Sequence, residues 1–279
     1  MKTEAILKLM EETFGEVWAA SFYGSQVCGY ATRDSDYDVL VVFDDYGPGV
    51  KYTYVDAGAE LAFLGVSRRV LEDDARDSAY GGFIADRLIN PLQPILNNTY
   101  IRSQEIERKK TIIAWETEKL VYRYKEKSVY LDINLLYYPY KKWRKIAGVY
   151  HPYKYSIENV LRSDLRGKNL KALLPGFQKA IVELGILTET YPGWYRPGEE
   201  YVKKTLSHTL KPGLERAKIV EREIEGVVAR YLTHSRAGDS DRDLIIKEVL
   251  SKVKREVRQI GEKKTRSALI DPKRFLIKP

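Results

Sequence analysis

The sequence predicts an α+β fold, with a small mixed β-sheet in the N-terminal part and a mostly helical C-terminal part. Three observations support this prediction. Short runs of β-branched and aromatic residues are concentrated before position 70, as is typical of strands. Apolar residues follow a helical spacing over most of the later chain. The balance of charge also reverses between the two parts.

The N-terminal elements follow from local signals. Thr3 can cap a first helix, whose apolar positions have helical spacing and which Gly15 ends. Two glycines and a proline mark a turn over residues 44–50. A mainly helical pattern begins near Leu71. Strands are predicted over Val17–Tyr23 and over residues 39–43, 52–55 and 60–66.

Two carboxylates stand at alternate positions where an apolar run begins. Asp36 and Asp38 immediately precede the strand predicted over residues 39–43. Side chains at i and i+2 of a strand point to the same face, roughly 7 Å apart. Two like charges held so close repel each other, and a divalent cation between them would remove that cost. Mg²⁺ prefers such hard oxygen ligands.

The pattern resembles the catalytic core of the DNA polymerase β-like nucleotidyltransferase superfamily. In that family a strand leads into Gly-Ser, and a spacer of about ten residues leads to Asp-x-Asp at the start of the next strand. Here Val17–Tyr23 precedes Gly24-Ser25, and Asp36-x-Asp38 opens the second run. The resemblance covers about residues 1–75. An ordinary Asp-rich turn is the alternative interpretation.

The resemblance implies roles for individual residues. Asp36 and Asp38 would hold Mg²⁺ or Mn²⁺ against the phosphates of an NTP. A third carboxylate is expected from a later strand; Glu60 is the main candidate and Asp56 the rival, and this family more often has Asp there. Gly24 and Ser25 would contact the phosphates. Four arginines could also reach them, and Arg33 is the one assigned to the nucleotide: Arg33, Arg68, Arg69 and Arg87.

Charge divides the chain into an acidic and a basic part. Residues 1–100 contain 8 Lys and Arg against 16 Asp and Glu, which leaves 39 basic and 23 acidic residues in 101–279. We therefore predict a catalytic domain over 1–103 and a basic substrate-binding domain over 104–279. The second domain is expected to bind a polyanion, RNA above all. The alternative is the highly charged surface of a thermophile.

Aromatic and basic residues are interleaved over residues 130–155. Lys141, Lys142, Arg144 and Lys145 alternate with several tyrosines and Trp143. Rings and cations in this arrangement suit stacking on bases and contact with phosphates. Packing between helices explains any single ring equally well. The four basic residues are the predicted nucleic-acid contacts.

The C-terminal part is predicted to be helical and similar to a winged helix. A long helix is expected over 105–127, two short helices over 168–173 and 177–185, and a hairpin around Pro192-Gly193. An amphipathic stripe over 245–260 would pack either on this domain or on a second copy of the chain. The second arrangement would be a homodimer.

Other features restrict the class of protein. One cysteine, Cys28, excludes an intramolecular disulfide and a cysteine-based zinc site. No apolar run is long enough to span a membrane, so a cytoplasmic protein is expected. We thus predict a metal-dependent enzyme that transfers an NMP from an NTP to a hydroxyl group, most readily on a tRNA-like RNA. The alternatives are transfer to a small molecule or a protein side chain, and an inactive nucleic-acid-binding regulator.

Overall fold

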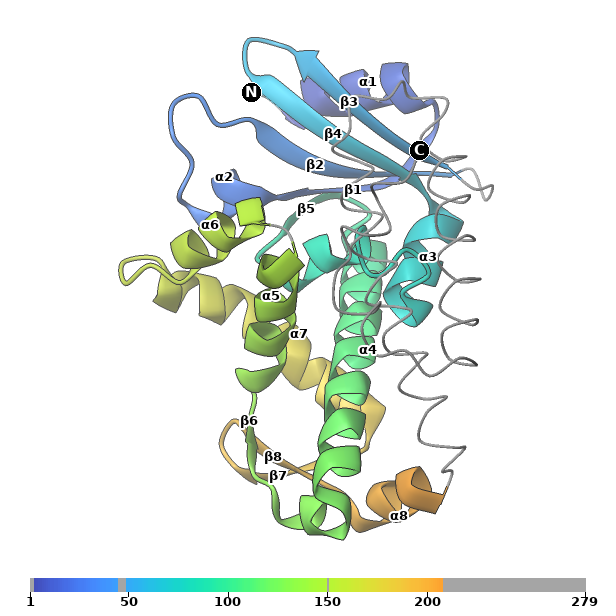
Figure 1. The fold of residues 1–279 in the computed structure, drawn as a ribbon. Helices are drawn as coiled ribbons and strands as arrows, with labels where there is room; N and C mark the ends of the chain where they lie inside the picture. The colour runs from blue at the N-terminus through green and yellow to red at the C-terminus, as the bar shows by residue number, and fades with distance from the viewer. Residues whose placement is uncertain (1–2, 45–48, 150, 208–279) are drawn as a thin grey trace, which may run out of the picture.

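The computed structural model describes residues 3–44, 49–149 and 151–207, and its architecture is α+β (Figure 1). The N-terminal part contains a mixed sheet of five strands in the order β3-β4-β2-β1-β5. β1 is antiparallel to β2 and β5, β2 is parallel to β4, and β3 is antiparallel to β4. The strands are β1 (Val17–Tyr23), β2 (Tyr37–Phe43), β3 (Val50–Asp56), β4 (Glu60–Ser67) and β5 (Gln93–Leu96).

Helices alternate with the strands in the N-terminal part and make up most of the C-terminal part. The N-terminal ones are α1 (Thr3–Phe14), α2 (Gly24–Cys28), α3 (Arg68–Asp77) and the 3₁₀ helix η1 (Ala85–Ile89). The later ones are α4 (Asn98–Tyr124), η2 (Lys125–Tyr130), α5 (Tyr137–Val149), α6 (His151–Val160), α7 (Arg166–Leu184) and α8 (Glu199–Ser207). A second sheet has the order β6-β8-β7, with β6 (Ile133–Asn134), β7 (Leu187–Tyr191) and β8 (Trp194–Pro197).

Alternate side chains of the central strands pack on opposite faces of the large sheet. Val39, Val41 and Phe63 pack with Ile6 and Met10 of α1. The alternate residues of β2 and β4 pack instead with α3, η1 and the start of α4. Because side chains alternate along a strand, this division fixes the direction in which every residue of β2 points. Asp38 therefore shares its face with Leu40, on the side of α3 and α4.

Helix α4 joins the two parts and crosses the domain boundary predicted at residue 103. It begins at Asn98, seven residues before the predicted start, because the side chain of Asn97 accepts a hydrogen bond from the backbone N–H of Tyr100. It packs on α3 and β1 of the N-terminal part and on α5 and α7 of the C-terminal part.

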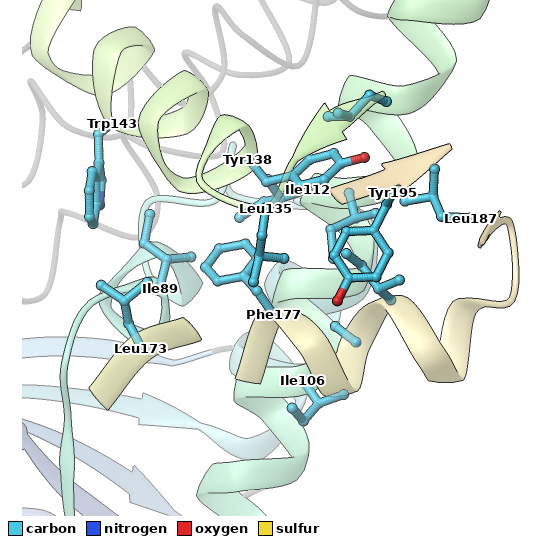
Figure 2. Close-up of a cluster of buried hydrophobic side chains, with 14 of the residues drawn as sticks. Ile89, Ile106, Ile112, Leu135, Tyr138, Trp143, Leu173, Phe177, Leu187 and Tyr195 are labelled. Atoms are coloured by element: carbon cyan, nitrogen blue, oxygen red, sulfur yellow. The ribbon is translucent and has the colours of Figure 1, made fainter. Parts of the chain in front are cut away.

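The C-terminal core has large side chains from α4, α5 and α7 and from the strands β7 and β8 (Figure 2). Tyr138 and Trp143, both from the aromatic and basic region, are buried in it. Their polar atoms are satisfied: the Tyr138 hydroxyl is 3.0 Å from that of Thr117, and Trp143 Nε1 donates to Asn90 Oδ1 at 2.8 Å. For these two rings, the structure shows packing and not an exposed stacking surface.

Three local predictions need correction. Residues 168–173 and 177–185 belong to one helix, α7, which continues through Pro175. Strand β5 was not predicted; it is a short edge strand, where a proline such as Pro94 is tolerated. Residues 78–92 form turns and η1 instead of a longer helix. The hairpin around Pro192-Gly193 is confirmed as β7 and β8, whereas the stripe over 245–260 lies outside the described residues.

Buried charges fix the segment between α3 and α4. The carboxylate of Asp74 accepts hydrogen bonds from four backbone N–H groups, those of Tyr80, Gly82, Ile84 and Ala85, at 2.8–2.9 Å. The guanidinium of Arg108, fully buried in α4, contacts Asp86 at 2.7 Å. These bonds anchor η1 beneath the sheet. Among the helices of the described ranges, none is both long and apolar enough to cross a bilayer.

Candidate functional site

The Gly24-Ser25 pair forms the turn from β1 into α2. Gly24 has φ +76°, a conformation that favours glycine. A Cβ atom added to it would lie 1.9 Å from Oδ2 of Asp38. The backbone of Gly24 thus lies directly against the carboxylate of Asp38. No residue with a side chain could take this place without moving that carboxylate.

Asp36 and Asp38 lie close enough to influence each other. Asp38 is paired with Tyr23 across β1 and β2, and Asp36 immediately precedes β2. The pKa of Asp38 is raised from 3.8 to about 7, mainly by burial and then by the negative charge of Asp36, while the cation of Arg87 acts in the opposite direction. The charge of Asp36 therefore acts on Asp38 at the start of β2.

The loop before Asp36 is tied to α2 by hydrogen bonds. Gln26 Nε2 donates to the carbonyl oxygen of Ser35 at 3.1 Å, and the backbone N–H of Thr32 donates to Ser35 Oγ at 2.9 Å. Gly29 ends α2 with φ 83°. The loop is thereby folded back, so that both Gly24 and Asp36 lie at the same end of the sheet. Arg33 lies exposed on this loop.

The structure separates the four arginines that the sequence could not rank. Arg68 pairs with Asp44 at 2.9 Å, and Arg69 lies 3.6 Å from Asp73 on the exposed side of α3. Arg87 instead extends from η1 towards the carboxylates. Its guanidinium lies 4.2 Å from the ring centroid of Phe83.

Tyr23 links Arg87 to the two aspartates. Its hydroxyl is hydrogen-bonded to Arg87, and its pKa is raised above the ordinary value mainly by burial and by the charge of Asp38. Arg87 is thus the only one of the four arginines whose charge acts on the pKa of Asp38 in the described part of the chain. The sequence names Arg87 as one of four candidates but could not single it out, because its position depends on how η1 folds beneath the sheet.

The two candidates for the third carboxylate lie in different surroundings. Asp56 accepts a hydrogen bond from the backbone N–H of Gly58 at 3.0 Å, as a turn residue does. Glu60 begins β4 and is exposed. Because Tyr37 pairs with Leu61, the same register continued by one residue brings Glu60 beside Asp36. Within the ranges that the structure describes, however, no three acidic, histidine or cysteine side chains form a group that could hold a metal ion.

The two carboxylates, next to the backbone of Gly24, still supply the oxygen ligands that a hard divalent cation prefers. Asp36 and Asp38 supply the oxygen atoms. The carboxylate of Asp38 occupies the space that a side chain at position 24 would need, so Oδ2 of Asp38 lies directly against the Gly24 backbone. The residues present therefore fit Mg²⁺ or Mn²⁺ shared with a phosphorylated ligand.

The four predicted nucleic-acid contacts on α5 have different environments. Lys142 Nζ lies 3.2 Å from Asp86, and Lys145 Nζ lies 2.6 Å from Glu116. Lys141 lies near the ring of Tyr137, at 6.0 Å from its centroid. Arg144 is exposed. The charges of Lys142 and Lys145 are thus matched by acids of the same chain.

The N-terminal end of α7 lies against α2. Asn169 is buried, and its Nδ2 donates to the carbonyl oxygens of Cys28 at 3.1 Å and Val160 at 3.0 Å. A Cβ at Gly29 would lie 3.7 Å from Lys168 Nζ. The basic part of the chain therefore reaches the same end of the sheet as Gly24 and Asp38. The comparisons add no family to this description: no family model and no curated protein matches the sequence.

Proposed function

We propose that this protein is a metal-dependent nucleotidyltransferase that transfers an NMP from an NTP to a hydroxyl group of RNA. One observation carries the proposal: the backbone of Gly24 lies against the carboxylate of Asp38, with Asp36 close by. Folding alone gives no reason to hold two carboxylates together at a half-buried strand end. A cation and a polyphosphate give one.

The residues of the site have separate tasks in this proposal. Asp36 and Asp38 would hold Mg²⁺ or Mn²⁺, which when bound neutralises charge on the phosphates. Gly24 lets the backbone approach the phosphates, and Ser25 offers its hydroxyl and N–H groups. Arg87 lowers the pKa of Asp38 and so favours the ionised form that a cation requires. Arg33, exposed on the adjoining loop, would contact the nucleotide.

Glu60 is the proposed base for the attacking hydroxyl. The register that pairs Tyr37 with Leu61 places it on the strand next to Asp36, on the side away from Gly24. A carboxylate there can accept the hydroxyl proton without approaching the leaving phosphates. Its exposure leaves room for an acceptor.

RNA is the proposed acceptor because the helical part is basic and reaches the site. Residues 101–207 contain 21 Lys and Arg against 12 Asp and Glu. The chain order β6, α5, α6, α7, β7, β8, with a sheet ordered β6-β8-β7, supports a winged-helix-like module. In that module α7 would face the nucleic acid, and its exposed basic residues near the site are Arg166, Lys168 and Lys171.

A second candidate is a nucleic-acid-binding regulator on the same fold. The observation that favours it is that the described residues contain no group of three acidic, histidine or cysteine side chains that could hold a metal ion. Such a protein would bind RNA through its basic part and transfer nothing. The two candidates differ in turnover and not in RNA binding.

Labelled NTPs incubated with Mg²⁺ and total RNA test the proposal. The wild-type protein should label RNA, and Asp36→Asn with Asp38→Asn should abolish the labelling while the protein stays folded. Asp34→Asn is the matched control, because Asp34 is an exposed carboxylate on the same loop. Label on small molecules or protein would change the acceptor. No label with salt-sensitive RNA binding would support the regulator.

A further inference from the structure

Two tyrosines of the edge strand β3 lie on the same face of the sheet as the aspartates. Tyr54 pairs with Ala62 of β4, and Ala62 pairs with Asp38 of β2. Directly paired residues of neighbouring strands point to the same face. Tyr54, Ala62 and Asp38 therefore form one row across the sheet. With strands about 4.8 Å apart, Tyr54 begins about 10 Å from Asp38.

The ring of Tyr54 is accessible and supported. Its side chain is among the exposed large ones of the described residues, with 58% of its surface exposed. Tyr52, two positions earlier on the same face, packs its ring edge-on against that of Tyr54, with centroids 5.2 Å apart at 77°. Ala62, between Tyr54 and Asp38, is too small to separate a bound group from either. An exposed ring held by a second ring is a surface on which a planar group can stack.

The order of the strands decides which substrate this surface faces. Gly24 and β1 lie on one side of β2, and β4 and β3 lie on the other. In the proposed function, which this inference rests on, the phosphates of the NTP contact Gly24. In an in-line displacement the attacking and leaving oxygens lie on opposite sides of the phosphorus. The acceptor hydroxyl must then come from the side of Glu60 and Tyr54.

The bond changes agree with this placement. The acceptor 3′-oxygen forms a bond to the α-phosphorus, and the bond from that phosphorus to the bridging oxygen breaks. Pyrophosphate leaves with the electron pair, on the Gly24 side. The hydroxyl proton passes to the carboxylate of Glu60. A nucleoside that presents its 3′-oxygen here has its base next to β3.

We propose that Tyr54, supported by Tyr52, is the stacking site for the 3′-terminal nucleobase of the RNA acceptor. Stacking accepts any base, because each has a planar face. Tyr54 would thus orient the end of the RNA and select a nucleic acid over a small hydroxyl compound. It is a positioning residue: it holds the acceptor and takes no part in the bond changes.

A 12-nucleotide single-stranded RNA with 2-aminopurine at its 3′ end tests this site by fluorescence. Stacking on a ring quenches the probe, so the wild-type protein and Tyr54→Phe should quench it, and Tyr54→Ala should not. Tyr191→Ala is the matched control, because Tyr191 is 64% exposed and lies in the second sheet. Equal quenching by wild type and Tyr54→Ala would overturn the proposal.

Steady-state kinetics provide a second readout that a merely structural role would not produce. Tyr54→Ala should raise the KM for the RNA by roughly 5- to 150-fold, the range expected for one lost base–ring contact, and leave the KM for the NTP unchanged. A raised KM for the NTP alone would assign the ring to the donor base and reject the proposal. Turnover that survives Asp36→Asn with Asp38→Asn would reject the proposed function, whereas the fluorescence result would still decide on Tyr54.

Discussion

Gly24 and Asp38 show how one residue's lack of a side chain shapes the candidate site. The resemblance implied that Gly24 lies near the phosphates, but only the structure shows how close its backbone comes to Asp38. Two effects act together at Gly24: φ is +76°, and a Cβ would lie 1.9 Å from Asp38 Oδ2. The first effect costs about 1 kcal/mol for a residue with a side chain, and the second forces a carboxylate to move.

Gly24→Ala should therefore lose function beyond its cost in stability. We expect the free energy of unfolding to fall by roughly 1–3 kcal/mol and transfer to fall by at least about 100-fold, because Asp38 is displaced. Gly15→Ala is the control: Gly15 has φ +79° but open space around its Cβ position. It should lose stability and keep transfer, and an equal loss of transfer in both variants would contradict this account.

The raised pKa of Asp38 predicts an unusual dependence of stability on pH. A carboxyl whose pKa rises from 3.8 to about 7 on folding binds its proton more tightly in the folded state. Its ionised form therefore costs stability above pH 7, and that cost disappears as the pH falls towards 4. In EDTA at pH 8, Asp38→Asn should raise the free energy of unfolding by roughly 2–4 kcal/mol.

Urea unfolding of Asp38→Asn and wild type between pH 4 and pH 8 measures this difference. It should shrink to nearly zero at the acidic end. Asp34→Asn, at an exposed position, should show no such trend. A stabilisation of Asp38→Asn that does not change with pH would show that desolvation and repulsion at this site are not its cause.

At the scale of elements, strands were predicted more accurately than helix junctions. Val17–Tyr23 was predicted with its observed bounds, because a short run of mainly apolar residues ends at Gly24. Helix α7 was predicted as two helices, because Pro175 and Gly176 normally interrupt one. The helix continues because its buried face packs on α4, where Lys109 Nζ donates to the carbonyl oxygen of Leu173 at 2.9 Å. No local signal reports that contact.

Gly176 of α7 lies close to two side chains of α4. A Cβ there would lie 2.5 Å from Glu105 Oε1 and 2.5 Å from Lys109 Nζ, both buried and paired with each other. Gly176→Ala should destabilise the protein by roughly 2–4 kcal/mol, since a buried ion pair must move.

Gly167→Ala is the matched control in the same helix. Nothing lies within 4 Å of its Cβ position, so alanine should be neutral or stabilise by up to about 1 kcal/mol through helix propensity. Thermal or urea denaturation measures both variants. If Gly176→Ala were as stable as Gly167→Ala, the close packing of α4 on α7 would not hold.

At the scale of the whole molecule, the sequence shows that acidic and basic residues are concentrated in different parts of the chain. It does not show which of the basic residues lie exposed on the surface. A count of charges cannot tell an exposed cation from one that neutralises a nearby acid. Lys142 and Lys145 belong to the second kind, since they pair with Asp86 and Glu116. For the same reason, Asp74 and Arg108 gave no sign of their structural roles.

RNA binding should therefore depend on α7 more than on Lys142 and Lys145. Replacing Arg166, Lys168 and Lys171 by alanine should weaken RNA binding and reduce the slope of log K against log salt by up to about 2. Lys142→Ala with Lys145→Ala should mainly lower stability, because two buried acids lose partners. If the α5 double variant weakened RNA binding and the α7 triple variant did not, RNA would bind at α5.

Isothermal titration calorimetry with Mg²⁺ and a non-hydrolysable NTP tests most directly whether the two aspartates and Gly24 form a site for a cation and a polyphosphate. The wild-type protein should bind the nucleotide only when Mg²⁺ is present, and Asp36→Asn with Asp38→Asn should abolish that binding without unfolding the protein. Nucleotide binding that is equally tight without Mg²⁺, or in the double variant, would contradict the account.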